Sequence, residues 1–326
     1  MTSLYPLKLI PAAKEILWGG HKLKDSYHKS APFEKLAETW ELTVRPQEMN
    51  IIENGAAAGQ TLEDYIRENG FGTVSPGYDG ERFPLLIKFI DACDRLSIQV
   101  HPDDAYGLAN EGELGKTEMW YIVEAEPGAS LVYGLKDGLS AEDFAEAVHA
   151  GRIGETLRSV EVHAGESYFI PSGQIHAIGA GILIAEIQQN SNVTYRVYDY
   201  DRRQADGSLR QLHTEKALDV VKIRTDAEID EIRYANADSC STETELAACP
   251  YFRVRRFSTE NLPASVTPAD SFIHLLCVDG EGEIRSNGVV YPVIKGDSYF
   301  LPRGCGECCL SGSMTVLLSE TTEAGL

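Results

Sequence analysis

The sequence predicts a mainly β protein made of two copies of one barrel-like module, with a few short helices. One spacing occurs twice, in residues 165–176 and in residues 296–307: a glycine, five residues, a proline, one residue and a second glycine. In each copy a short apolar run precedes the proline, which indicates a strand that ends at the proline and a turn at the second glycine. A template repeated far along the chain is typical of duplicated structural units.

Short apolar runs and helix-start signals predict the remaining elements. Runs at 183–187, 272–278 and 314–318 indicate further strands. Thr61 and Ser140 are each followed three residues later by an aspartate, a capping-box pattern that marks a helix start. The predicted helices cover 61–70, 140–149 and 214–221.

A small and polar segment, residues 235–240, is the best linker in the chain. We therefore expect a first domain over residues 1–235, which holds a metal site and the short helices, and a smaller second domain over residues 236–326. A chain of 326 residues is long enough to bury a core in each of two domains.

A set of metal-ligand side chains lies near predicted strand ends in the first module. Gln99 and His101 are two positions apart and so face the same side of a strand, which Pro102 ends. Glu118 begins another apolar run, and His176 follows the first glycine-proline turn. Two imidazoles and a carboxylate suit a divalent metal, most simply Zn²⁺ with an open position. A histidine at a strand end also commonly serves as a hydrogen-bonded surface or core residue, so the spacing alone leaves both roles open.

The second module lacks this set. Glu307 stands where the first copy has His176, and His274 in an early strand is not followed by the Pro-Asp-Asp of the first copy. We expect no metal there, and a structural role for that module.

Composition limits the partners of the protein. A net charge of −21 argues against nucleic-acid or anionic-membrane binding, because phosphate backbones require a basic face. No run approaches the eighteen apolar residues of a membrane span, and the N-terminus has no signal-peptide pattern. Seven cysteines, an odd number, fit reduced thiols better than a disulfide framework. We expect a cytoplasmic protein that is a monomer or a small homo-oligomer.

Several motifs together resemble a known family. They are the Gln-x-His-Pro element at 99–102, the Lys-x-Glu element at 116–118, the Pro-x-Gly-x-x-His element at 171–176, and the segments 16–20, 38–41, 83–88 and 186–202. Their order and combination are similar to those of type I mannose-6-phosphate isomerases of the short bacterial form. The resemblance covers nearly the whole chain and implies two cupin domains, which are jelly-roll-like β-barrels.

The resemblance also implies an activity, the interconversion of mannose 6-phosphate and fructose 6-phosphate through a cis-enediol. One Zn²⁺ per chain would act as the Lewis acid. Two alternatives remain open: the same isomerase chemistry on another hexose 6-phosphate, or a metal-dependent sugar-phosphate-binding or regulatory protein without turnover.

Carried over by position, the resemblance implies metal ligation by Gln99, His101, Glu118 and His176. Gln99 could instead hydrogen-bond a metal-bound water or a sugar hydroxyl, because an amide oxygen is a weak ligand for Zn²⁺. Arg196 matches the arginine that the family uses in catalysis, and would contact either the developing charge or the phosphate.

Other polar residues complete the implied site. Lys116, Glu186, Asp199 or a metal-bound water would move the proton at C2. Lys88, Ser97 and Lys116 are candidates for polar and phosphate contacts, although for each alone a solvated or salt-bridged surface role is equally open, and Asp199 is a further candidate substrate-binding residue. Trp18, Trp40 and Glu41 would wall the sugar site, although an ordinary core role is the more common one for the tryptophans.

Overall fold

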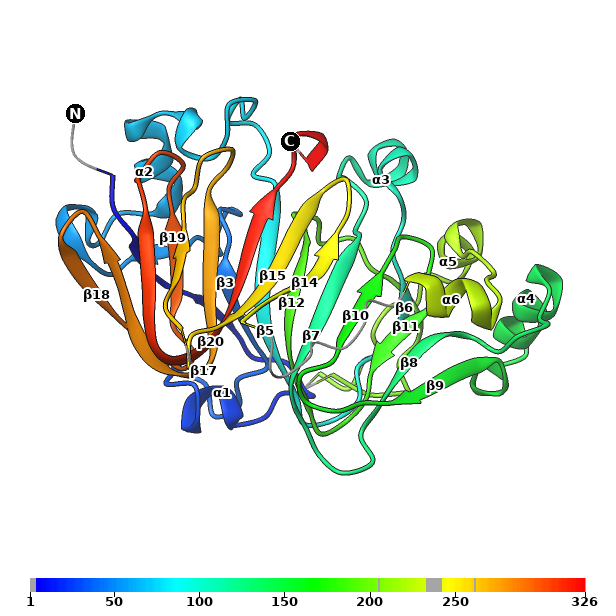
Figure 1. The fold of residues 1–326 in the computed structure, drawn as a ribbon. Coiled ribbons are helices and arrows are strands. Elements are labelled where there is room, and N and C mark those ends of the chain that lie inside the picture. Colours follow the sequence, from blue (N-terminus) through cyan, green and yellow to red (C-terminus); the bar gives the residue numbers. More distant parts are fainter. Residues whose placement is uncertain (1–3, 205, 233–241, 261, 326) are drawn as a thin grey trace.

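The computed structural model describes residues 4–204, 206–232, 242–260 and 262–325. Within these residues the strands form three sheets arranged as layers, with the six-stranded sheet between the other two (Figure 1). The mainly β fold class that the sequence predicts is therefore confirmed.

Each sheet is antiparallel, and the order of its strands in space differs from their order along the chain. The nine-stranded sheet contains β14 (Glu243–Ala248), β15 (Phe252–Ser258), β20 (Cys308–Thr321), β17 (Ile273–Ser286), β19 (Ser298–Leu301), β1 (Leu7–Ile10) and β4 (Ile51–Ile52), with β16 (Ala264–Val266) beside β20 and β18 (Val289–Ile294) beside β17. The six-stranded sheet contains, from one edge to the other, β10 (Ser167–Ile170), β7 (Glu118–Ala125), β12 (Ile182–Gln189), β5 (Leu85–Ala92), β3 (Glu38–Leu42) and β2 (Ala12–Lys14). The five-stranded sheet contains, in the same manner, β13 (Tyr195–Tyr198), β6 (Ile98–Val100), β11 (His176–Ile178), β8 (Ser130–Leu135) and β9 (Leu157–Glu161).

The helices are short and lie at the ends and outer side of the sheets (Figure 1). They are α1 (Lys22–Asp25), α2 (Leu62–Asn69), α3 (Asp104–Glu111), α4 (Ala141–His149), α5 (Thr214–Val220) and α6 (Asp226–Ile232), with 3₁₀ turns at Gly55–Ala57, Phe71–Thr73, Ile153–Glu155 and Glu323–Gly325. The three predicted helices are confirmed as α2, α4 and α5. The hydroxyls of Thr61 and Ser140 accept the predicted cap hydrogen bonds from Asp64 and Asp143. In the described part of the chain no helix is long and apolar enough to cross a membrane.

The six-stranded sheet is covered on both faces, so its central strands β5 and β12 are buried along their whole length. On one face Phe89, Tyr121 and Ile187 pack against the nine-stranded sheet. On the other, Ile90 and Trp120 pack toward the five-stranded sheet. Since successive strand residues point to opposite faces, two apolar layers require a nearly continuous apolar run, which is the pattern that 183–187 shows.

The repeated template forms the same turn in both modules. The leading glycines, Gly165 and Gly296, have φ of 92° and 93°, and the later glycines, Gly173 and Gly304, have φ of 82° and 83°. These left-handed values suit glycine because a side chain would be strained there. The expectation of two copies of one turn-strand unit is confirmed by these matching angles.

The N-terminal segment takes part in the sheet of the second module. Strand β1 pairs with β19, and Leu7 lies opposite Phe300. The predicted linker at 235–240 lies outside the described residues, and the division of the chain at residue 235 stays a prediction.

A buried polar network joins the two modules. Lys29 Nζ donates to Glu41 Oε2 at 2.7 Å and to the carbonyl of Gly296 at 2.5 Å. Ser298 Oγ donates to the carbonyl of Glu41 at 2.9 Å and lies 2.8 Å from His274 Nε2. Because a buried ion pair is costly unless its groups are well placed, this network fixes one relative position of the modules.

Candidate metal centre and active site

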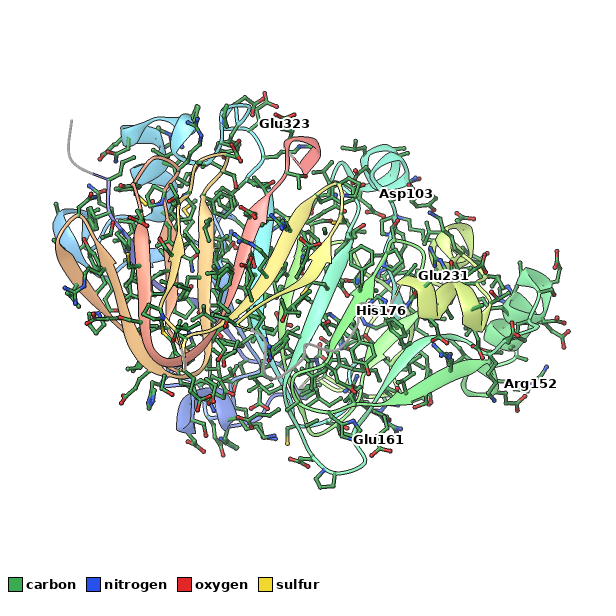
Figure 2. All side chains as sticks on the ribbon, in the orientation of Figure 1. Asp103, Arg152, Glu161, His176, Glu231 and Glu323 are labelled. Carbon is green, nitrogen blue, oxygen red and sulfur yellow. The ribbon has the colours of Figure 1, made fainter. Side chains whose placement is uncertain are left out.

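Two histidines and a glutamate meet inside the first module. His101 directly follows β6, Glu118 opens β7 and His176 opens β11, so the facing five- and six-stranded sheets both contribute. The ligand atoms of the three side chains lie within 4.8 Å of one another, and all three residues are buried. Figure 2 shows His176 inside the molecule, whereas Asp103 and Arg152 lie at its periphery.

The histidine rings are held with their Nε2 atoms toward each other. His101 Nδ1 lies 2.8 Å from the carbonyl of Val193, and His176 Nδ1 lies 2.8 Å from the carbonyl of Gln174. Each Nδ1 therefore carries the proton and donates it, which leaves Nε2 as an acceptor. Burial lowers the pKa of His101 well below its usual value and that of His176 to about 4, so both rings are neutral.

This arrangement fits a bound cation. The two Nε2 atoms lie 3.1 Å apart, and Glu118 Oε1 lies 3.4 Å from that of His176. Two lone pairs and a buried carboxylate oxygen repel one another at these distances. The spacing matches nitrogens bound at about 2.0–2.1 Å in a tetrahedral zinc site, which are roughly 3.3 Å apart. The cluster is therefore suited to hold a metal ion.

Gln99 lies beside the cluster. Its Nε2 is 3.3 Å from His176 Nε2, and its Oε1 is 3.3 Å from Ser97 Oγ. Half a turn of the amide would present the oxygen to the cluster. Direct ligation by Gln99 stays a prediction.

Two buried carboxylates share two lysines next to the cluster. Lys116 Nζ lies 2.9 Å from Glu118 Oε2 and 3.6 Å from Glu186 Oε1, and Lys88 Nζ lies 3.2 Å from the same Glu186 oxygen. Burial raises the pKa of Glu118, and the charge of Glu186 raises it further. For Glu186, burial is outweighed by Lys116 and Lys88, which lower the pKa. Glu186 is therefore the ionised member of the pair, while Glu118 is the carboxylate that a metal would complement.

Strand register places Glu186 and Lys88 in one row across the six-stranded sheet, between two tryptophans. Glu186 lies opposite Lys88 on β5 and opposite Trp120 on β7. Lys88 in turn lies opposite Trp40 on β3. Trp120 Nε1 donates to Glu186 Oε2 at 2.9 Å, and Lys88 Nζ lies 5.1 Å from the centre of the Trp40 ring.

A second row crosses the five-stranded sheet. Gln99 on β6 lies opposite both His176 on β11 and Arg196 on β13. The predicted catalytic arginine is thus two strands away from His176, with Gln99 between them. Side chains of both rows line one pocket, so the two sheets form its opposite walls.

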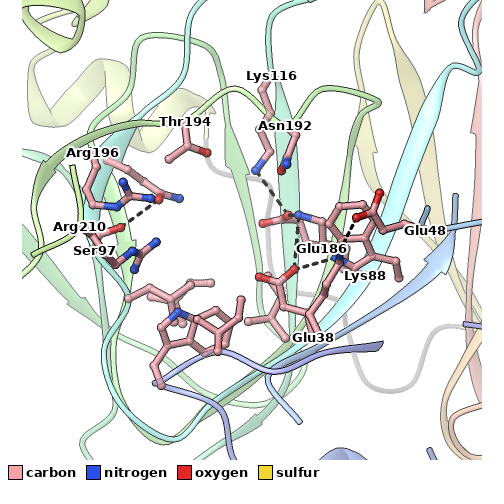
Figure 3. A pocket seen from close by; sticks show the side chains of 18 residues that line it. Glu38, Glu48, Lys88, Ser97, Lys116, Glu186, Asn192, Thr194, Arg196 and Arg210 are labelled. Atoms are coloured by element: carbon pink, nitrogen blue, oxygen red, sulfur yellow. Dashed lines mark hydrogen bonds and ion pairs between the residues drawn. The ribbon is translucent and has the colours of Figure 1, made fainter. Parts of the chain in front are cut away.

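This pocket has a volume of about 390 Å³ and is drawn in Figure 3. The predicted residues that line it are Trp18, Trp40, Lys88, Ser97, Gln99, Lys116, Glu186 and Arg196. The predicted metal ligands His101, Glu118 and His176 are not among the lining residues, and neither are two further predicted residues, Glu41 and Asp199. Glu41 points to the opposite face of β3 and pairs with Lys29, because neighbouring strand residues alternate. Asp199 is buried outside the pocket and binds Arg202 and Arg210.

No pattern in the sequence points to one prominent pocket residue, Arg210. It lies beyond a bridge between Arg203 and Leu209, in a segment without regular periodicity. Asn192 and Thr194 also line the pocket, and together with Arg196 they occupy every second position of the chain. That alternation is a signal that could have found them.

In the second module, the corresponding positions form a different structure. Glu307 is exposed, and its carboxylate accepts a hydrogen bond from Ser265. His274 is buried, and its Nε2 lies 2.8 Å from Ser298 Oγ. The absence of a metal in this module stays a prediction.

The fold and this site define a protein of two β modules, of which the first encloses a buried metal-type cluster beside a charged pocket. Two family models match separate parts of the chain. The model described as "Phosphomannose isomerase type I, catalytic domain" matches residues 6–122, and that described as "Mannose-6-phosphate isomerase, cupin domain" matches residues 242–321.

Individual relatives match over nearly the whole chain. Mannose-6-phosphate isomerase ManA of Bacillus subtilis is 38% identical over 97% of this chain and 98% of its own length. The mannose-6-phosphate isomerase of Streptococcus mutans is 35% identical over 98% of this chain and 99% of its own length. The chain therefore belongs to the type I phosphomannose isomerase family, whose members are aldose-ketose isomerases.

Solved structures show the same fold. The crystal structure of mannose 6-phosphate isomerase from Bacillus subtilis superposes with a TM-score of 0.86 at 33% identity, covering 97% of this chain and 99% of that one. The apo form from Salmonella typhimurium gives a TM-score of 0.78 at 18% identity, over 99% of this chain and all of that one. Together with the cupin-domain match over residues 242–321, these structures confirm the predicted mainly β fold with a cupin domain.

Proposed function

We propose that this protein interconverts mannose 6-phosphate and fructose 6-phosphate at the pocket between the five- and six-stranded sheets. The observation that supports this most is the buried His101–Glu118–His176 cluster, which adjoins a pocket of about 390 Å³ with charged walls. The family membership, at 38% identity over almost the full chain, supports the choice of sugar phosphate.

The cluster would hold one Zn²⁺ through both Nε2 atoms and the Glu118 carboxylate, with Gln99 as the further ligand. A bound Zn²⁺ supplies Lewis-acid chemistry toward the sugar oxygens. The protein contributes the ring orientation, because the carbonyls of Val193 and Gln174 fix both histidine tautomers.

The isomerisation moves a proton from C2 to C1 through a cis-enediol. Among the proposed bases, Glu186 has the most suitable position. Its carboxylate reaches the pocket from β12 and is oriented by Trp120 and Lys88. Lys116 bridges Glu186 and Glu118 and is placed to donate a hydrogen bond to a sugar oxygen.

Arg196 faces this carboxylate from the other wall. Its guanidinium is a permanent cation, and it stands one strand from Gln99. We assign it the stabilisation of negative charge on the substrate. A cytoplasmic location and a monomer or small homo-oligomer remain predictions from the sequence.

A coupled assay of fructose 6-phosphate formation tests the proposal. The protein is measured as purified, after chelation and dialysis, and after Zn²⁺ is restored, with mannose 6-phosphate and glucose 6-phosphate as parallel substrates. We expect turnover of mannose 6-phosphate that disappears with the metal and returns with it. If only glucose 6-phosphate were converted, the substrate would be glucose 6-phosphate rather than mannose 6-phosphate. A lack of turnover by the metal-loaded protein would favour a binding or regulatory role.

A further inference from the structure

The charges that line the pocket are not distributed evenly. Figure 3 shows Lys88, Glu186, Glu38 and Glu48 on one side and Arg196, Arg210 and Ser97 on the other. The two sides differ in how far each positive charge is already neutralised.

On the lysine side, every cation has a carboxylate partner. Lys88 lies 3.2 Å from Glu186 and 3.9 Å from Glu38. Lys116 lies 2.9 Å from Glu118, and Lys14 pairs with Glu48. Each of these three lysines is therefore already paired with a carboxylate, and a dianionic ligand placed here would find no unmatched positive charge in the absence of a metal.

The arginine side has the opposite balance. Asp199 is shared between Arg202, at 2.5 Å, and Arg210, at 3.4 Å, and Arg202 also lies 3.8 Å from the exposed Asp94. No carboxylate of the described residues lies within ion-pair distance of Arg196. Three guanidinium groups therefore face two carboxylates, and the unmatched charge points to the pocket.

Arg196 also has an unused donor. One of its terminal nitrogens donates to the carbonyl of Gln211 at 2.8 Å, but its buried Nε has no hydrogen-bond partner in the described residues. Burial lowers the pKa of Arg196, and the charge of Arg210 lowers it further. Two adjacent guanidinium groups with a free donor are a setting that an oxyanion would complete.

The geometry points to Arg210, with Arg196 and Ser97, as the site that binds the phosphate group of the substrate. Asp199 acts as a positioning residue that orients Arg210 toward the pocket from behind. Guanidinium groups bind phosphate oxygens through two parallel hydrogen bonds, and the Ser97 hydroxyl adds a further donor. The phosphate sites expected from the sequence, Lys88 and Lys116, would instead serve the sugar and the carboxylates.

Distances along β6 are consistent with this assignment. Ser97, Gln99 and His101 alternate on one side of the chain, so successive members are about 6.6 Å apart. The metal cluster contacts Gln99 and His101, and Ser97 lies one step further away. An extended hexose chain would thus reach from the metal cluster toward the arginines. This inference rests on the proposed function for the identity of the sugar, but phosphate binding is measurable without it.

The test uses inorganic phosphate as the probe on chelator-treated protein, because a bound metal would itself attract phosphate. Calorimetric titration compares the wild type with Arg210→Gln, Arg210→Lys and Lys88→Gln. The matched control is Arg203→Gln, an exposed arginine of the same segment that does not line the pocket. We expect Arg210→Gln to weaken phosphate binding at least tenfold, Arg210→Lys to retain part of the affinity, and Arg203→Gln and Lys88→Gln to remain near the wild type.

Unchanged affinity in Arg210→Gln overturns the assignment, as does a loss in Lys88→Gln that equals that of Arg210→Gln. If Arg210→Gln fails to fold, as judged by circular dichroism, Arg210→Lys decides in its place. With turnover established, Arg210→Gln should lower kcat/KM for mannose 6-phosphate much more than for unphosphorylated mannose. A wild type that binds phosphate through Arg210 but does not turn over mannose 6-phosphate would refute the proposed function and leave this inference standing.

Discussion

Gln99 lies directly opposite Arg196 in the pairing of β6 with β13, and this register couples the arginine wall of the pocket to the metal cluster. On its other side Gln99 pairs with His176. A single strand residue therefore separates the group that would hold the metal from the group that would balance substrate charge. Any shift of β6 by one residue would turn both contacts away from the pocket.

Replacing His176 with alanine should remove metal and activity together. The ring is fixed by the Gln174 carbonyl and supplies one of three ligand atoms. Losing even an outer-shell partner costs about 10–100-fold in metal affinity, so loss of a ligand should cost more. Zinc content after dialysis and kcat are measured on the same samples. The exposed His163 provides the control variant His163→Ala, and full activity in His176→Ala would reject the assigned site.

Replacing Glu186 with glutamine should reduce kcat by about 10²–10⁴-fold, the usual contribution of a general base. Glutamine keeps the side-chain shape and still accepts the hydrogen bond from Trp120. Because Glu186 is not part of the cluster, zinc content should stay at the wild-type level. Glu161→Gln, on the exposed side of β9, is the control. A kcat close to that of the wild type would leave proton transfer to another group.

The buried His274 predicts a pH dependence of stability. Burial lowers its pKa from 6.5 to about 3 in the folded protein, so below pH 6.5 the unfolded chain takes up a proton that the folded chain does not. Its contribution to stability is therefore complete above pH 6.5 and is lost as the pH falls toward 3, at about 1.4 kcal/mol per pH unit.

Urea unfolding of the wild type and His274→Gln between pH 7 and pH 4.5 measures this effect. Both proteins contain His101 and His176, so the difference in slope isolates His274. The wild type should lose stability more steeply than the variant. Parallel curves would mean that His274 titrates alike in the folded and unfolded chains.

Sequence reasoning is most successful where a local pattern determines local structure. The template at 165–176 predicts a strand, a stop and a turn, because glycine alone tolerates the φ of about 92° that Gly165 adopts. Helix α3 is not among the predicted helices, although Asp103 is a good cap residue. Pro102 is a clear signal for a strand end, and the helix that begins directly after it has no other strong start signal. The Asp103 side chain accepts a hydrogen bond from the Tyr106 backbone.

The arrangement of the site depends on information that no local pattern contains. Alternation places Gln99 and His101 on one side of a strand, but it cannot show that Glu186 lies opposite Lys88. That register depends on strands almost a hundred residues apart. The same limit explains Asp199, whose place behind Arg210 follows from the path of an irregular loop.

The two leading glycines of the repeat should respond differently to substitution by alanine. Gly165 and Gly296 share a φ near 92°, so alanine is strained at both by about 1–2 kcal/mol. A Cβ on Gly165 would meet open space, whereas one on Gly296 would lie 2.3 Å from the carbonyl oxygen of Tyr27. Backbone atoms cannot move aside as a flexible side chain can. The Gly296 carbonyl also accepts a hydrogen bond from Lys29 in the network between the modules.

We therefore expect Gly165→Ala to lower the free energy of unfolding by about 1–2 kcal/mol and Gly296→Ala by clearly more. Urea unfolding of both variants at one pH gives the comparison, with each serving as the other's control for backbone strain. Equal losses would show that the contact with Tyr27 relaxes at no cost. A larger loss in Gly296→Ala, with isomerase activity retained per folded molecule, would show that the second module stabilises the protein through this close packing rather than through the chemistry of the pocket.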